Sequence, residues 1–114
     1  MLIYNTSFHV EGERTLQPFL TYMRDVYLPA LRQGGLLLRL RFVHLLTDIG
    51  DEKFGYCVMV EVEDLKTLKK WKLEVANAAD TNFHKEFGEK VLTFSSTMKE
   101  VEGGRVNGCS AGQS

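Results

Sequence analysis

The first predicted strand constrains the fold of this chain more than any other segment. Read as a β-strand, residues 2–10 place successive side chains on opposite faces of a sheet. One face is largely apolar and predicts half of a hydrophobic core. The other carries three hydrogen-bonding side chains in a row, so it either faces water or lines a cavity. The two sets are Leu2, Tyr4, Thr6, Phe8 and Val10 on the apolar face, and Ile3, Asn5, Ser7 and His9 on the other.

Two longer segments have the spacing of amphipathic helices. Apolar residues recur at three- and four-residue steps in residues 15–31 and again in residues 64–87. Pro29 is expected to loosen the last turn of the first helix. The second segment forms either one long helix or two helices joined by a bend, because polar positions interrupt its middle. The expected boundaries are Thr15 and Asp64 as N-caps, and Gly34-Gly35 and Gly88 as C-terminal ends.

Three further segments are typical of β-strands. Residues 36–46 are strongly apolar, and residues 53–62 alternate cleanly between faces, so we expect them to form a hairpin across a loop at residues 49–52. Residues 91–101 make the last strand. Its two faces would carry Leu92, Phe94, Ser96 and Met98 on one side, and Thr93, Ser95 and Thr97 on the other.

The chain of 114 residues has the size of one domain, which we place at residues 1–101. Residues 102–114 are rich in Gly, Ser and Asn and are expected to form a disordered tail. The net charge of −1 argues against a nucleic-acid partner, and no stretch approaches the roughly 20 apolar residues of a membrane span. We expect a cytoplasmic protein with reduced cysteines, Cys57 in the core and Cys109 exposed. The spacing of the His and Cys residues indicates no metal site, and no cofactor is expected.

The order of elements, β-α-β-β-α-β, predicts a ferredoxin-like α+β fold, in which four antiparallel strands carry both helices on one face. The first and third strands are then central, and the helices should cover their even-numbered, apolar residues. The opposite face is too apolar to be left bare and too polar to be a plain core. A second copy packed sheet against sheet would cover it, so we expect a homodimer that encloses a mixed cavity. This face would collect Ile3, Asn5, Ser7, His9, Arg41, Val43, Leu45, Cys57, Met59, Glu61, Thr93 and Ser95.

Several short motifs resemble those of a bacterial family, domain of unknown function 4286 (DUF4286), over residues 1–101. They are Ile3-Tyr4-Asn5-Thr6 with His9-Val10, Tyr27-Leu28-Pro29 near the end of the first helix, and Phe87-Gly88 followed by Val91, Phe94 and Thr97. The resemblance implies a dimeric α/β-barrel protein. Relatives in that wider group include cofactor-free monooxygenases, small isomerases and haem-degrading enzymes. The resemblance therefore supports a dimer and supplies no reaction.

His9 shares its strand face with Asn5 and Ser7. In a functional interpretation His9 is a catalytic base or proton shuttle in the cavity, and Asn5 and Ser7 orient a polar ligand. In a structural interpretation, which we favour, His9 ends the strand and hydrogen-bonds a loop or water.

Arg39 and Arg41 interrupt an apolar strand. They either bind a ligand carboxylate, pair with Glu61 or Glu63 on the neighbouring strand, or protect a sheet edge from aggregation. The structural roles are favoured. Arg41 and Glu61 are nevertheless candidate ligand-binding residues, because both belong to the mixed face.

Two other groups of residues are weaker candidates. Asn5, Trp71 and His84 match the order of catalytic residue types in haem-degrading enzymes, but strand parity points Asn5 away from the helices. Trp71 is better explained as a core residue. The lysines of the second helix are best explained as a solvated face, since acidic residues flank them and no aromatic residues lie between them. They are Lys66, Lys69, Lys70 and Lys72.

The mixed face contains no complete catalytic constellation. The sequence therefore favours a homodimeric small-molecule-binding or structural protein. The alternative is a cofactor-independent enzyme of the monooxygenase or isomerase kind, with His9, Asn5 and Arg41 in its cavity. Whether the protein is an enzyme stays open at this level.

Overall fold

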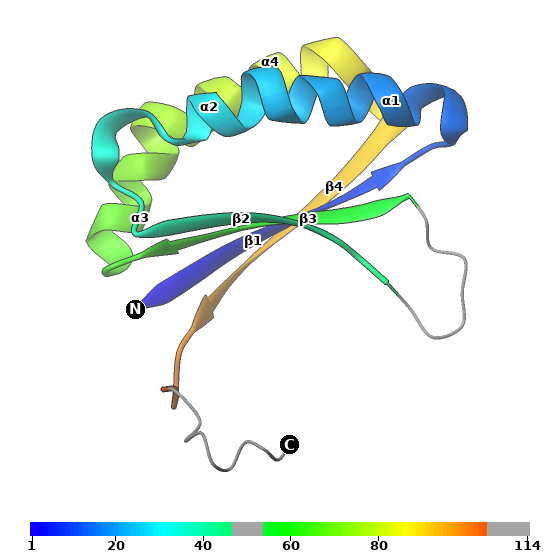
Figure 1. Ribbon diagram of the computed structural model, residues 1–114. Helices are drawn as coiled ribbons and strands as arrows, with labels where there is room; N and C mark the ends of the chain where they lie inside the picture. Colours follow the sequence, from blue (N-terminus) through cyan, green and yellow to red (C-terminus); the bar gives the residue numbers. More distant parts are fainter. Residues whose placement is uncertain (47–53, 105–114) are drawn as a thin grey trace.

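The fold is a four-stranded antiparallel sheet with its helices on one face, in the chain order β-α-β-β-α-β (Figure 1). The computed structural model of this chain describes residues 1–46 and 54–104. The strands lie in the order β2-β3-β1-β4, so the first and third strands are central. The predicted ferredoxin-like fold is confirmed. The strands are β1 (Leu2–Val10), β2 (Arg39–His44), β3 (Gly55–Val62) and β4 (Val91–Lys99).

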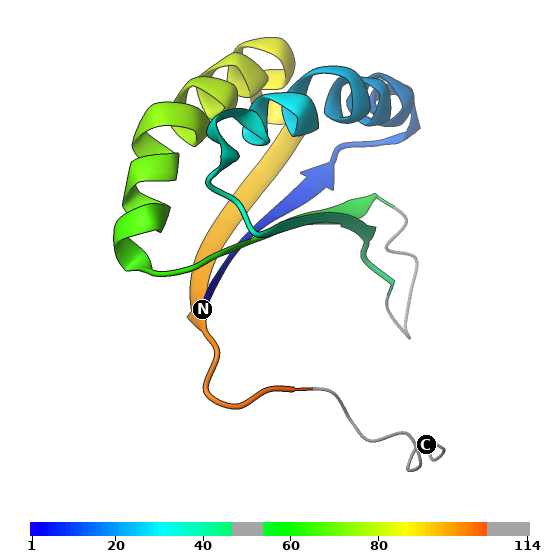
Figure 2. The same cartoon turned by 60° about the vertical axis from the view of Figure 1, so that its left-hand side comes forward.

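Two helical connections join the strands, the first between β1 and β2 and the second between β3 and β4. Each of them contains one wider, π-helical turn. The first π turn, Met23–Tyr27, ends two residues before Pro29, and the N–H of Leu28 donates to the carbonyl of Met23. Pro29 has no N–H, so a loosened turn at this point is expected and found. The second connection is an unbroken helical run that bends around the π turn Lys72–Ala76 (Figure 2). The helices are α1 (Glu13–Tyr22), α2 (Leu28–Leu31), α3 (Leu65–Trp71) and α4 (Asn77–Phe87).

The predicted caps of the second helical connection are confirmed. The Asp64 carboxylate accepts a hydrogen bond from the backbone N–H of Thr67 at 2.8 Å. Gly88 ends α4 with φ 58°, a conformation that glycine adopts without a steric penalty. The predicted cap at Thr15 is wrong, because Gly12 occupies the N-cap position and accepts a hydrogen bond from the N–H of Thr15 at 3.1 Å.

Two predicted strands are shorter than expected. β2 begins at Arg39 rather than at residue 36, because the 3-10 turn Gln33–Gly35 leads into Leu36, whose backbone is still helical with φ −89° and ψ −14°. It ends at His44 rather than at residue 46. β4 ends at Lys99 rather than at residue 101. The predicted loop at residues 49–52 and the end of the predicted tail, residues 105–114, lie outside the described residues.

The core lies between the sheet and the helix layer and is rich in aromatic rings. Phe83 of α4 is at its centre, with its ring centroid 5.3 Å from that of Phe8 and 5.5 Å from that of Tyr27. The buried indole of Trp71 donates a hydrogen bond to the carbonyl of Leu31 at 3.0 Å, which joins α3 to the end of α2. Trp71 is thus a core residue, as predicted. The helix layer covers one face of the sheet only (Figure 1).

Candidate functional site

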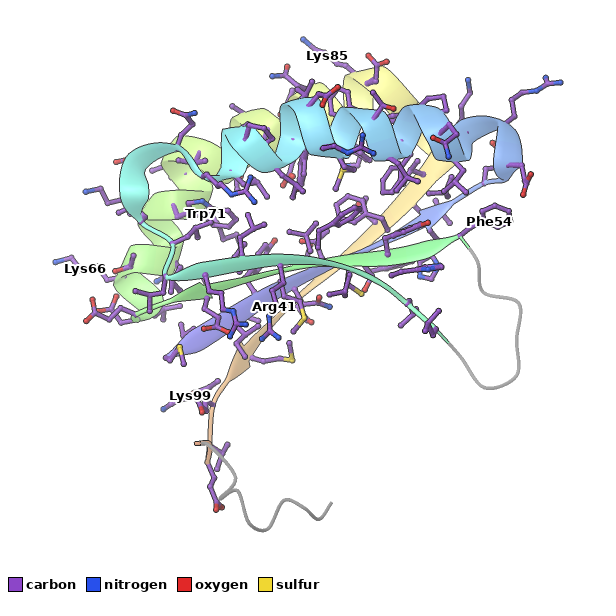
Figure 3. The ribbon with its side chains drawn as sticks, in the orientation of Figure 1. Arg41, Phe54, Lys66, Trp71, Lys85 and Lys99 are labelled. Carbon is purple, nitrogen blue, oxygen red and sulfur yellow. The ribbon has the colours of Figure 1, made fainter. Side chains whose placement is uncertain are left out.

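The sheet face away from the helices, here called the open face, is the candidate site. In Figure 3 Arg41 projects from β2 on this side, whereas Trp71 lies on the helix side. Cross-strand pairing assigns every strand residue to one of the two faces. The open face comprises Ile3, Asn5, Ser7 and His9 of β1, Arg39, Arg41 and Val43 of β2, Gly55, Cys57, Met59 and Glu61 of β3, and Leu92, Phe94, Ser96 and Met98 of β4.

The residues of β4 that were expected on the open face are wrong. Thr93 and Ser95 lie on the helix side, because Ser95 is paired with Thr6 and its hydroxyl is 3.1 Å from the Thr6 hydroxyl. The alternate residues of β4 face the open side instead. Its apolar members are exposed in the single chain: Leu92 by 56%, Phe94 by 62% and Met98 by 40%. The open face is therefore more apolar than the sequence predicted.

A column of polar side chains runs along β1 through the middle of the open face. Asn5, Ser7 and His9 are each half-buried. The Ser7 hydroxyl lies 3.6 Å from the Cys57 thiol, and the His9 ring meets the Phe94 ring edge-on with centroids 6.1 Å apart. The buried Oδ1 of Asn5 accepts no hydrogen bond within the described chain. The predicted trio is thus brought together on one face. Cys57 lies on this face, as strand parity predicted, so the separate expectation that it is a core residue is wrong.

Arg41 and Glu61 meet on the open face. An Nη2 of Arg41 lies 3.4 Å from Oε2 of Glu61, and this ion pair is one of the structural roles predicted for the arginine. Arg39 is directly opposite Glu61 in the β2–β3 pairing and makes no ion pair with any described residue. Both arginines therefore flank a single carboxylate at one edge of the face.

The residues matched to haem-degrading enzymes do not form one site within the chain. Asn5 is on the open face, Trp71 is buried on the helix side, and His84 is exposed on α4. The lysines of α3 are exposed, as a solvated face requires. Lys72 is half-buried, and its Nζ lies 4.8 Å from the centroid of the Tyr4 ring. No helix among the described residues is long and apolar enough to cross a membrane.

A partly buried pair of polar side chains in the helix layer was not anticipated from the sequence. The hydroxyl of Tyr27 donates a hydrogen bond of 2.7 Å to Oδ1 of Asp80, which joins the two helical connections. Burial raises the pKa of Tyr27 far above its ordinary 10.0, so the hydroxyl keeps its proton and remains a donor. Burial also raises the pKa of Asp80 above its ordinary 3.8, although the Tyr27 bond and the positive charges of His84 and Lys72 oppose this.

Asp80→Asn is expected to flatten the pH dependence of stability. The folded protein holds the Asp80 proton more tightly than the unfolded chain does, so the free energy of unfolding falls as pH rises from 3.8 through the raised pKa. Asparagine still accepts from Tyr27 and carries no charge, so the variant should be at least as stable as the wild type above that window. Urea unfolding at several pH values measures this. Asp25→Asn, at an exposed position of the first connection, should keep the wild-type slope; a wild-type slope in Asp80→Asn contradicts the prediction.

Solved structures share the fold at low sequence identity. A protein of Deinococcus radiodurans described as a candidate antibiotic biosynthesis monooxygenase matches with a TM-score of 0.70 and 9% identity, over 95% of this chain and 100% of that one. An ethyl tert-butyl ether degradation (EthD) family protein of Bacillus halodurans matches with a TM-score of 0.67 and 15% identity, over 84% and 97%. A dimeric ferredoxin-like protein of an uncultured marine organism matches with a TM-score of 0.65 and 15% identity, over 93% and 100%. These likenesses show the fold alone.

Sequence comparison supplies the family. No curated protein matches the chain. The family described as domain of unknown function DUF4286 matches residues 1–101, which include the whole sheet and both helical connections. The motifs on β1 and β4 that resembled this family thus lie within the matched range. The chain belongs to the DUF4286 family.

Proposed function

We propose that the protein is a homodimer whose two open faces cover each other and enclose a binding site for a small molecule. The exposure of Leu92, Phe94 and Met98 on the open face carries this proposal. Large apolar side chains gathered on one sheet face are typical of an interface, because covering them releases water from apolar surface. A second copy of the same face offers the same apolar side chains in return.

The polar column favours a ligand between the two copies over a dry interface. The side chains of Asn5 and Ser7 would lose contact with water when the faces are covered, and a buried polar group without a partner costs about 1–3 kcal/mol. The Oδ1 of Asn5 already lacks a donor within the described chain. A small molecule with hydrogen-bonding groups would satisfy these side chains, while its apolar part would lie against β4.

The proposal has two parts, a dimer and a bound small molecule, and one structure of the same fold supports each part. The ferredoxin-like protein of the marine organism is described as dimeric. A MhuD mutant, similar to this chain with a TM-score of 0.61 and 14% identity, was solved with two manganese protoporphyrin IX molecules bound per active site. These two descriptions support a dimer and an organic ligand for a protein of this fold.

Native mass spectrometry of the purified protein tests both parts together. We expect a species at twice the 13.0 kDa chain mass, and a small co-purified mass that is lost when the dimer is dissociated by activation in the gas phase. A species at the mass of one chain under the same conditions contradicts the proposal. A dimer that carries no added mass, and that binds no compound in a screen of apolar acids, amides and alcohols, leaves only a structural role.

A cofactor-independent enzyme of the monooxygenase or isomerase kind is the second candidate, because His9 shares the open face with Asn5 and Arg41. In that case His9 acts as the base, and His9→Ala should reduce turnover of a bound substrate by about 10²–10⁴-fold while binding persists. His44→Ala is the matched control, since His44 lies on the helix side, stacked on Tyr56 with ring centroids 4.6 Å apart. Unchanged turnover in His9→Ala would rule this candidate out.

A further inference from the structure

We propose that the ligand of the open face is an amphipathic monoanion, a carboxylate on an apolar body, whose charged end is held by Arg39 and Arg41. This inference rests on the proposed function and goes beyond it by naming the chemical class of the ligand. It starts from the distribution of charge. The chain has a net charge of −1, but the strand residues of the open face include two arginines and one glutamate, which leaves +1.

Hydrogen-bond donors also outnumber acceptors at this edge of the sheet. Two guanidinium groups offer ten N–H donors, whereas the carboxylate of Glu61 has about four acceptor positions. The contact between Arg41 and Glu61 is a single one of 3.4 Å and not a two-bond pair. The Arg41 side chain is 45% exposed and that of Glu61 only 16%, so the free donors face outward and the carboxylate does not.

A second copy of the open face cannot supply the missing negative charge. Its strands again present two arginines and one glutamate, so the two faces together carry an excess of two positive charges. Covering a charge without a partner is costly, because water is removed from it in a medium of low dielectric constant. One anion per protomer removes the excess, and a guanidinium group binds both oxygens of a carboxylate.

The rest of the face specifies the body of such a ligand. Arg41 lies on β2 at one edge of the sheet, and the exposed Phe94 and Met98 lie on β4 at the other. Three strand spacings of about 4.8 Å separate these edges, or roughly 14 Å. Met59 lies between them beside Asn5, and thioether and aromatic side chains pack well against flat rings. A flat, apolar acid of about this length fits the face.

Biphenyl-4-carboxylate and biphenyl-4-carboxamide are the matched probes, because they differ only in charge at the polar end. Isothermal titration of the dimer is expected to show that the acid binds at least about 10-fold more tightly than the amide. In Arg39→Met/Arg41→Met the acid should lose at least about 10-fold in affinity, and the amide should change less than about 3-fold. Glu61→Gln removes the competing carboxylate and should strengthen binding of the acid only.

Lys69→Met/Lys70→Met is the control, since it removes the same charge from exposed positions of α3 and should leave both affinities unchanged. Equal affinities of acid and amide for the wild-type dimer overturn the inference and leave the proposed small-molecule site standing. Loss of the dimer in Arg39→Met/Arg41→Met also overturns it, because the arginines would then serve assembly. Binding of neither compound to a dimer rejects the anion site, and a monomeric wild type rejects the proposed function as well.

Discussion

Replacing Phe94 with aspartate is expected to turn the proposed dimer into a folded monomer. The Phe94 side chain is 62% exposed in the single chain, so it contributes little to the core, yet it lies on the face that a second copy would cover. Burying one phenylalanine contributes about 1.5–3 kcal/mol, and a symmetric dimer buries two. Losing both, with two carboxylates in their place, should raise the dissociation constant by at least about 100-fold.

Light scattering during size-exclusion chromatography measures the change at micromolar concentration. Leu73→Asp is the matched control, because Leu73 is even more exposed, at 74%, but belongs to the helix layer. This control should remain dimeric. Circular dichroism should show that both variants keep their helices and strands. A dimer of unchanged affinity in Phe94→Asp would show that β4 is not part of the interface.

Phe83→Ala should cause the largest loss of stability of any single substitution proposed for this chain. Phe83 is buried, and its ring packs against Phe8 of β1, Tyr27 of the first helical connection and Phe87 of its own helix. Removing a buried ring of this kind costs about 3–5 kcal/mol. A domain of this size is stable by only about 5–15 kcal/mol, so the variant should lose a large share of its free energy of unfolding and unfold at a much lower urea concentration.

Urea unfolding followed by the fluorescence of Trp71, the single tryptophan, reports this loss. His84→Ala is the neighbouring control, since His84 is exposed on the same helix and its removal should shift the midpoint little. Phe83→Leu should recover part of the lost stability, because it refills some of the cavity. A Phe83→Ala midpoint equal to that of His84→Ala would mean that the aromatic cluster does not hold the helix layer on the sheet.

Parity predicted correctly which residues of the central strands β1 and β3 lie on each face of the sheet. Helices cover β1 and β3 on one side only, so alternate residues divide into a helix-side set and an open-side set, and Tyr4 and Asn5 lie where expected. The ion pair of Arg41 with Glu61 is one of the alternatives that the sequence left open for this arginine. Local signals were equally informative at Asp64, where a short polar side chain precedes an apolar helical pattern.

Strand parity did not predict the two faces of β4, which lies at the edge of the sheet. On β4 only Val91 is buried on the helix side, and the helices leave Ser95 and Thr97 exposed, so the apolar residues of this strand face away from the helices. The sequence does not show how far a helix layer reaches across a sheet. The bond between Tyr27 and Asp80 was also missed, because it joins residues 53 positions apart in separate elements.

The composition of β4 has a consequence for the protein at high dilution. No charged residue and no proline occurs between Lys90 and Lys99, and the strand lies at the edge of the sheet with one side of its backbone open to pairing. Uncharged edge strands of high β-propensity are templates for aggregation. Protomers released from the proposed dimer would therefore have a second fate, irreversible precipitation, and the yield of dimeric protein after refolding should depend on how quickly two chains meet.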